Sequence, residues 1–138
     1  MTDENKLNEE AKKELERGYD DAGKLLSDKD SFSKFLHEVE EKSKDLPLLG
    51  ELISKVALLL EMIKEYTEGT YRNMPIATAV AIVSALAYFL SPIDLIADVI
   101  PVIGHLDDAA VIGTCLTLIN GDVEKYEKWR NENQKKGV

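Results

Sequence analysis

The sequence predicts an all-α protein, a compact helical bundle of about five to six helices. Apolar residues recur at steps of three and four along most of the 138-residue chain, which is the period of an amphipathic helix. No segment shows the strict alternation of apolar and polar residues that is typical of a half-buried strand. Neither an internal repeat nor a low-complexity linker interrupts this pattern, so a helical fold is expected throughout.

Residues 1–45 predict an acidic N-terminal helical region. Its first helix, at 5–26, carries a narrow apolar stripe, and Gly18 and Gly23 weaken it by about 1 kcal/mol each. After a short break, Asp30 or Ser31 is suited to cap the next helix. The buried face expected for this second helix consists of Phe32, Phe35, Leu36 and Val39.

Residues 46–130 predict a helical domain, and residues 131–138 a solvated tail. The domain begins with an amphipathic helix of about five turns that ends near Gly69, a residue suited to a left-handed cap. Farther along, 109–120 forms an apolar helix, and Asp122 is suited to cap a last helix. The apolar positions of that last helix are Val123, Tyr126 and Trp129.

The segment from Ile76 to Leu90 is apolar nearly all round. A helix of this kind is either central in a bundle or embedded in lipid. The uncharged run at 73–92 approaches the roughly 20 residues that a membrane span needs. Its many alanines let neighbouring helices approach closely, and no basic residue follows to orient it in a membrane. We therefore favour a central core helix over a membrane span.

Composition and charge argue against several functions. A formal net charge of −9 argues against binding of nucleic acid, and against electrostatic attachment to anionic lipid, although apolar insertion stays open. Cys115 is the only cysteine, and its apolar helical surroundings favour a core residue over a nucleophile. The polar, acidic start is unlike a secretory signal, so we expect a cytoplasmic location, with association with the inner membrane left open.

The chain between the two most apolar helices predicts a helix–corner–helix connector at 91–108. Ser91-Pro92-Ile93-Asp94 has the form of a capping box, with Asp98 one turn after Asp94. Pro101 and Gly104 set a further corner, and Asp107 or Asp108 is suited to the N-terminus of the following helix. Each of these four carboxylates is therefore explained as a helix-terminus cap.

An alternative brings the same four carboxylates into one cation site. The carboxylates of Asp94, Asp98, Asp107 and Asp108 would offer oxygen ligands suited to Mg²⁺, Mn²⁺ or Ca²⁺, with His105 as a further candidate ligand. The spacing matches no EF-hand loop, and no histidine pair is present for zinc. His37 has no second ligand at a suitable spacing and is interpreted as a surface residue. We expect no cofactor beyond this possible cation.

The stretch YFLSPIDLIADVIPVIGHLDD, Tyr88 to Asp108, resembles the signature of the YkvA-like family, a domain of unknown function found mostly in bacterial proteins. Ala97 departs from the pattern, because the family usually has proline there. The resemblance extends more weakly over 46–129 and does not cover 1–45. It implies no reaction, but related domains are often predicted to be membrane-associated. The matching positions are Tyr88, Ser91, Pro92, Ile93, Asp94, Leu95, Ile96, Asp98, Ile100, Pro101, Gly104, Asp107 and Asp108.

Three functions are compatible with these observations. We favour a non-catalytic helical domain that binds an unknown protein partner or the membrane, because the sequence offers no nucleophile–base pair. The second is a divalent-metal-dependent enzyme that uses the aspartates, although no Lys or Arg lies between Arg72 and Lys125 to stabilise an anionic substrate. The third is an integral membrane protein in which 76–90 and 99–119 form a helical hairpin.

Overall fold

The computed structural model describes residues 2–44, 51–90 and 108–136, and over these ranges every regular element is an α-helix. The all-α class predicted from the sequence is confirmed. The predicted count was too low, because these ranges alone hold seven helices. The helices are α1 (Thr2–Arg17), α2 (Tyr19–Leu26), α3 (Lys29–Ser43), α4 (Glu51–Thr67), α5 (Ile76–Leu90), α7 (Asp108–Leu118) and α8 (Asn120–Lys136).

The single helix expected at 5–26 is in fact two helices, α1 and α2, which meet at Gly18. The Gly18 N–H bonds to the carbonyl of Leu15 at 3.2 Å, a three-residue step that closes α1. Its own carbonyl accepts from the N–H of Ala22 at 2.8 Å and so begins α2. The sequence pattern missed this break because the apolar stripe continues across it, whereas the chain turns there to follow the surface of α5.

The start of α3 also differs from the prediction. Its N-cap is Asp28, with extended backbone angles (φ −116°, ψ 105°), and not Asp30 or Ser31. The Asp28 carboxylate accepts from the backbone N–H groups of Asp30 at 3.2 Å and of Ser31 at 3.5 Å, and also from the Ser31 hydroxyl at 2.8 Å. It thereby satisfies donors that the first helical turn leaves open. The predicted buried face of this helix is confirmed.

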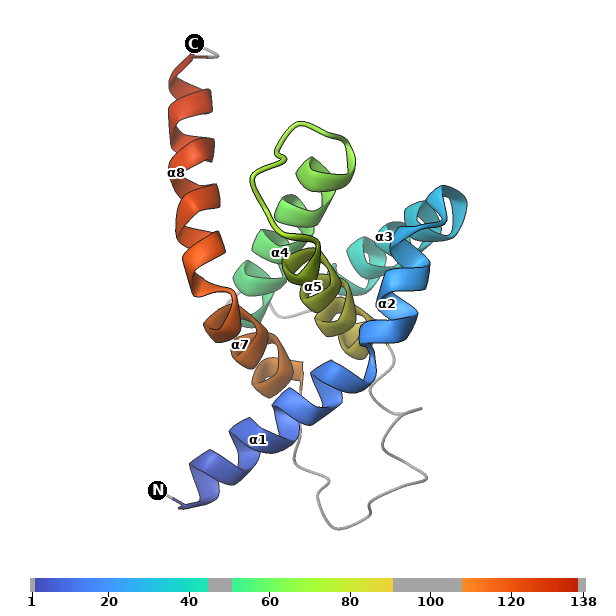
Figure 1. Ribbon diagram of the computed structural model, residues 1–138, viewed down its shortest axis with the longest axis vertical. Helices are drawn as coiled ribbons and strands as arrows, with labels where there is room; N and C mark the ends of the chain where they lie inside the picture. Colours follow the sequence, from blue (N-terminus) through green and yellow to red (C-terminus); the bar gives the residue numbers. More distant parts are fainter. Residues whose placement is uncertain (1, 45–50, 91–107, 137–138) are drawn as a thin grey trace.

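Helix α5 lies in the middle of the bundle, as its nearly unbroken apolar sequence predicts (Figure 1). It packs against α1, α2, α3, α4 and α7, and ten of its fifteen residues are buried. Small side chains on α5 allow these close approaches. Among the described residues, no helix combines the length and the apolar character that crossing a membrane requires. The exposed residues of α5, Ile76 and Ala77, lie at its start.

The link from α4 to α5 begins with a tight helix ending. Gly69 has a φ of +84°, as its predicted cap position requires, and its N–H bonds to the carbonyl of Tyr66 at 3.1 Å. The N–H of Thr70 reaches back to the carbonyl of Glu65 at 3.0 Å, which completes a Schellman motif. This ending directs Tyr71 into the core, where it lies against the rings of Tyr126 and Trp129.

Helix α8 continues to Lys136 and thus includes much of the predicted tail at 131–138. It begins at Asn120, so Asp122 lies in its first turn and not at the predicted cap position. The Asp122 carboxylate instead accepts a hydrogen bond of 2.6 Å from the hydroxyl of Thr78 on α5. At the other end of the chain, α1 and α2 pack on α5. The division of the chain at residue 45 stays a prediction.

Candidate functional site

The predicted connector lies almost wholly outside the described residues. These undescribed positions include its candidate cation ligands Asp94, Asp98 and Asp107. Its capping box and its cation site therefore stay predictions. The same holds for the other connector residues that the sequence singled out, Ser91, Pro92, Pro101, Gly104 and His105. At the two flanks, Tyr88 is buried near the end of α5, and α7 begins at Asp108, where a helix N-terminus was expected.

Lys42 of α3 binds the end of α5 from which the connector departs. Its ammonium group donates to the carbonyl of Phe89 and, at 3.4 Å, to the carbonyl of Leu90. The same nitrogen lies 4.9 Å from the centre of the Phe89 ring. A cation here compensates the partial negative charge of a helix C-terminus. The last turn of α5 is thus held by a residue of α3 that lies far away along the chain.

The lone cysteine is a core residue, as predicted. Cys115 is fully buried in α7, and its thiol donates to the carbonyl of Ala81 on α5 at 3.5 Å. Burial raises the pKa of this thiol to about 12, so it stays protonated at neutral pH. Nucleophilic catalysis requires the thiolate. Cys115 therefore serves the packing of α7 on α5 and not a reaction.

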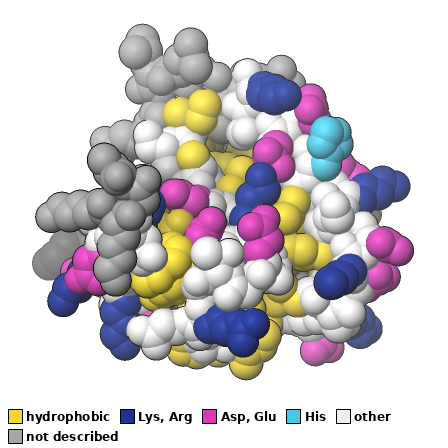
Figure 2. Space-filling model, turned by 90° about the horizontal axis from the view of Figure 1, so that it is seen from above, with side chains coloured by type: hydrophobic (Ala, Val, Ile, Leu, Met, Phe, Trp, Pro, Cys, Tyr) yellow, Lys and Arg dark blue, Asp and Glu magenta, His cyan; other side chains and the backbone are white. Residues whose placement is uncertain are grey.

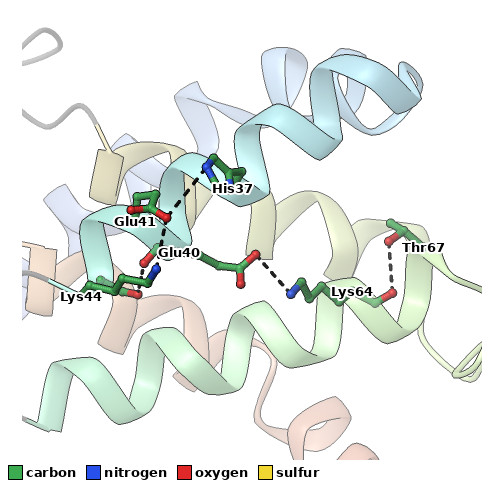
Figure 3. Close-up of polar contacts among 7 residues, drawn as sticks. His37, Glu40, Glu41, Lys44, Lys64 and Thr67 are labelled. Atoms are coloured by element: carbon green, nitrogen blue, oxygen red, sulfur yellow. Dashed lines mark hydrogen bonds and ion pairs between the residues drawn. The ribbon is translucent and has the colours of Figure 1, made fainter.

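His37 lies on the surface of α3, as predicted. Its Nε2 is 3.8 Å from the Glu41 carboxylate, and Lys44 approaches the same carboxylate to 3.2 Å (Figure 3). Close by, Glu40 pairs with Lys64 at 3.2 Å and joins α3 to α4. Throughout the described ranges, no three acidic, histidine or cysteine side chains gather as a metal site would need. The contacts of His37 and its neighbours are therefore ion pairs on the protein surface.

A groove of about 470 Å³ lies between the α4–α5 link and α8, and we call it the α8 groove. Its walls are Tyr71, Arg72 and Asn73 from the link, and Lys125, Lys128, Trp129 and Glu132 from α8. The Schellman ending at Gly69 positions the link residues, and the single-face spacing of α8 positions the rest. Three basic side chains and two aromatic rings therefore line one hollow.

The three cations of the α8 groove make no ion pair with any carboxylate in the described part of the chain. Arg72 uses its Nε–H to bond the carbonyl of Gly69 at 3.2 Å, which leaves its other N–H groups available. Lys125 and Lys128 are exposed. By contrast, Arg130 on the same helix pairs with Glu61 of α4 at 2.8 Å. The groove is thus locally basic in an acidic protein.

The sequence analysis missed this groove, because Arg72 and Lys125 are far apart along the chain. One signal was present: these two residues bracket the long segment that contains no lysine or arginine. Thr78 and Asp122, joined by their hydrogen bond, lie just inside the two ends of that segment. The fold therefore brings the bracketing charges to one end of the bundle.

Two large hydrophobic side chains are exposed near the same end. Ile76, the first residue of α5, is 61% exposed, and Leu118, the last residue of α7, is 48% exposed. The hydrogen bond between Thr78 and Asp122 ties the start of α5 to the start of α8, which follows α7 directly. On the face that Figure 2 shows, hydrophobic side chains also reach the surface between acidic and basic ones.

Comparison with known proteins agrees with the resemblance of the sequence to the YkvA-like family. The model of a family described as "Protein of unknown function (DUF1232)" matches residues 78–114, from within α5 to within α7. The chain is 36% identical over 78 residues to the "Uncharacterized membrane protein YkvA" of Bacillus subtilis (strain 168). That match covers 56% of this chain and 74% of the Bacillus protein. The chain belongs to the YkvA-like family. No solved structure matches it significantly.

The match places the YkvA-like core on a specific part of the bundle. Residues 78–114 include most of the central helix and the first half of α7, which pack against each other. Trp129 and the basic residues of the α8 groove lie outside that range. This YkvA-like chain thus surrounds the matched region with α1 to α4 and α8.

Proposed function

We propose that this YkvA-like chain is a non-catalytic helical domain that attaches to a membrane surface. The contact is the end of the bundle where α5 begins and α7 ends. The observation that carries the proposal is the exposure of Ile76 and Leu118 at that end. Apolar side chains of this kind insert at the boundary between headgroups and acyl chains. The Bacillus relative is named a membrane protein, and this name supports attachment to a membrane.

Attachment to the surface suits the packing of α5 better than insertion of α5 does. The helix is covered by α1, α2, α3, α4 and α7, so its apolar sides already face protein. Exposing them to lipid would require these helices to separate. Attachment through Ile76 and Leu118 leaves the bundle intact.

The non-catalytic part of the proposal rests on the side chains that the structure describes. Cys115 is buried and protonated, and His37 contacts a surface carboxylate. A buried, protonated thiol is not a nucleophile, and the pair of His37 with Glu41 lies on the exposed surface of α3. A divalent-metal-dependent reaction would have to use Asp94, Asp98, Asp107 and Asp108, whose side chains lie outside the described residues.

Flotation with lipid vesicles tests the proposal. The full chain is mixed with vesicles of phosphatidylethanolamine and phosphatidylglycerol and centrifuged through a density gradient. We expect the parent chain to float with the vesicles and the double variant Ile76→Asp/Leu118→Asp to stay at the bottom. Burying the exposed half of each side chain is worth roughly 1 kcal/mol. Removing both should therefore weaken binding by at least about thirtyfold.

The matched control is Ala57→Asp, which adds a carboxylate at an exposed position of α4. This variant should float like the parent chain. Circular dichroism must show that all three chains are equally helical. A parent chain that remains at the bottom with every vesicle composition would overturn the proposal and favour a protein partner. Flotation of the double variant equal to that of the parent would overturn the assigned contact.

A further inference from the structure

We infer that the α8 groove binds the phosphate group of an anionic lipid headgroup. The inference rests on the proposed membrane attachment and names the lipid chemistry that this end of the bundle selects. Arg72, Lys125 and Lys128 supply the positive charge, and Tyr71 and Trp129 supply an aromatic wall. The groove, at about 470 Å³, has room for a headgroup.

Charge is the first argument. Some cations of the described chain are neutralised by carboxylates, as Lys64 is by Glu40 and Arg130 is by Glu61. Arg72, Lys125 and Lys128 have no such partner within the described ranges, although the whole chain carries a net charge of −9. Salt screens distant surface charges beyond about 8 Å, so a lipid phosphate in the groove responds mainly to the charges that line it, three cations and the carboxylate of Glu132. The overall acidity therefore does not prevent local binding of an anion.

The chemistry of the lining is the second argument. Tyr71 is almost wholly buried, and its hydroxyl is without a hydrogen-bond partner in the described part of the protein. A buried hydroxyl without a partner is costly unless a ligand or water satisfies it. The Trp129 ring lies 5.0 Å from the Tyr71 ring and is half-buried. Tryptophan in this state is typical of the layer where headgroups meet acyl chains.

Position is the third argument. Arg72 also lines a second hollow, of about 530 Å³, together with Met74 and Ile76. The basic groove and the exposed Ile76 are therefore continuous through Arg72. In a bilayer the phosphates lie just outside the apolar region. A chain that inserts Ile76 would place Arg72 at the level of the phosphates.

Among the described residues that line the groove, Glu132 alone carries a carboxylate. Its negative charge opposes binding of an anion, so a variant without this charge tests the inference by an expected increase in affinity. Glu132→Gln removes this charge and should tighten binding, whereas Lys125→Gln/Lys128→Gln should weaken it. Lys12→Gln/Lys13→Gln on α1 changes the net charge equally and should have no effect, since both side chains are exposed and neither lines the groove.

The test is a titration of the full chain with short-chain phosphatidylglycerol below its micelle concentration. Trp129 is the only tryptophan in the chain, so its fluorescence reports on the groove directly. We expect a saturable change in emission, weakened by roughly tenfold or more in Lys125→Gln/Lys128→Gln. The α1 control should bind like the parent chain, and short-chain phosphatidylcholine should produce a much smaller response.

Several results would overturn the inference. They are an equal response to phosphatidylcholine, an equal loss in the α1 control, or tighter binding of inorganic phosphate or of an oligonucleotide than of phosphatidylglycerol. This titration uses no bilayer, so its outcome is separate from flotation. Flotation without a headgroup response would retain the proposed function and reject the groove. A headgroup response without flotation would retain the groove and reject the attachment.

Discussion

Gly18 and Ser84 lie in contact where the corner between α1 and α2 rests on the central helix. A Cβ on Gly18 would stand 2.4 Å from the Ser84 Oγ, closer than real Cβ contacts come. The Ser84 hydroxyl donates to the carbonyl of Leu15, which the Gly18 N–H also bonds. The buried hydroxyl of Ser84 thus finds its hydrogen-bond acceptor in the carbonyl of Leu15, at the end of α1. Only glycine, which has no side chain, fits next to Ser84 at position 18.

Gly18→Ala is predicted to lower the stability of the protein. The new methyl group has to displace Ser84 or the corner, which typically costs about 1 to 3 kcal/mol. Unfolding in urea, followed by circular dichroism, should show a lower midpoint with an unchanged slope. Adding Ser84→Ala should recover part of the loss, because it removes the oxygen that the methyl group meets.

Gly23→Ala is the matched control, since a Cβ there would meet nothing within 4 Å. Gly23 lies inside α2, so alanine should raise stability by about 0.5 to 1 kcal/mol through the helix preference alone. If Gly18→Ala were as stabilising as Gly23→Ala, the close contact with Ser84 would be wrong.

Thr78→Val is predicted to destabilise the end of the bundle that bears the exposed Ile76. The substitution keeps the shape of the side chain and removes the 2.6 Å hydrogen bond to Asp122. A hydrogen bond to a charged group contributes about 1.5 to 3 kcal/mol, so urea unfolding should show a loss of that size. Thr78→Ser keeps the hydroxyl and should lose less. Equal losses in both variants would contradict a role for the hydrogen bond.

The Asp28 cap predicts a dependence of stability on pH. Hydrogen bonds from the Ser31 side chain, the Ser31 backbone and the Asp30 backbone lower the pKa of Asp28 below 3.8 in the folded state. The carboxylate therefore stabilises the fold at pH values above 3.8, and this contribution is lost as pH falls through the folded-state pKa. Asp28→Ala should lower the melting temperature at pH 7 and lower it less at pH 3.

The matched variant for this cap is Asp28→Asn, which keeps an oxygen acceptor but cannot titrate. Its melting temperature should lie between those of the parent and Asp28→Ala at pH 7. Differential scanning calorimetry from pH 7 to pH 3 provides the measurement. A difference between parent and Asp28→Ala that grows toward pH 3 would contradict the assigned cap.

The Cys115 thiol is predicted to resist alkylation in the folded protein. Burial raises its pKa to about 12, compared with 9.0 for a free thiol, and excludes the reagent as well. Iodoacetamide at pH 8 should modify the folded chain very slowly and the chain in urea within minutes, as followed by mass spectrometry. Rapid labelling without denaturant would show that α7 separates from α5 under native conditions.

Much of the helical fold could be predicted from the sequence, because the relevant signals are local. The apolar period located α3, α4 and α5, and Gly69 marked the end of α4 through its left-handed backbone. The break at Gly18 was missed, because its cause is a contact with Ser84, far away in the chain. The contact of Lys42 with the end of α5 likewise has no local signal, because the two are far apart along the chain.

The sequence by itself determined the helical class, the YkvA-like family and the central place of the apolar helix, since residue type and period decide these. Only the tertiary structure decided which helix ends meet. It brings Arg72 to Lys125 and Lys128, and exposes Ile76 near them. Positions so distant along the chain have no local signal, because their proximity depends on how α5, α7 and α8 pack.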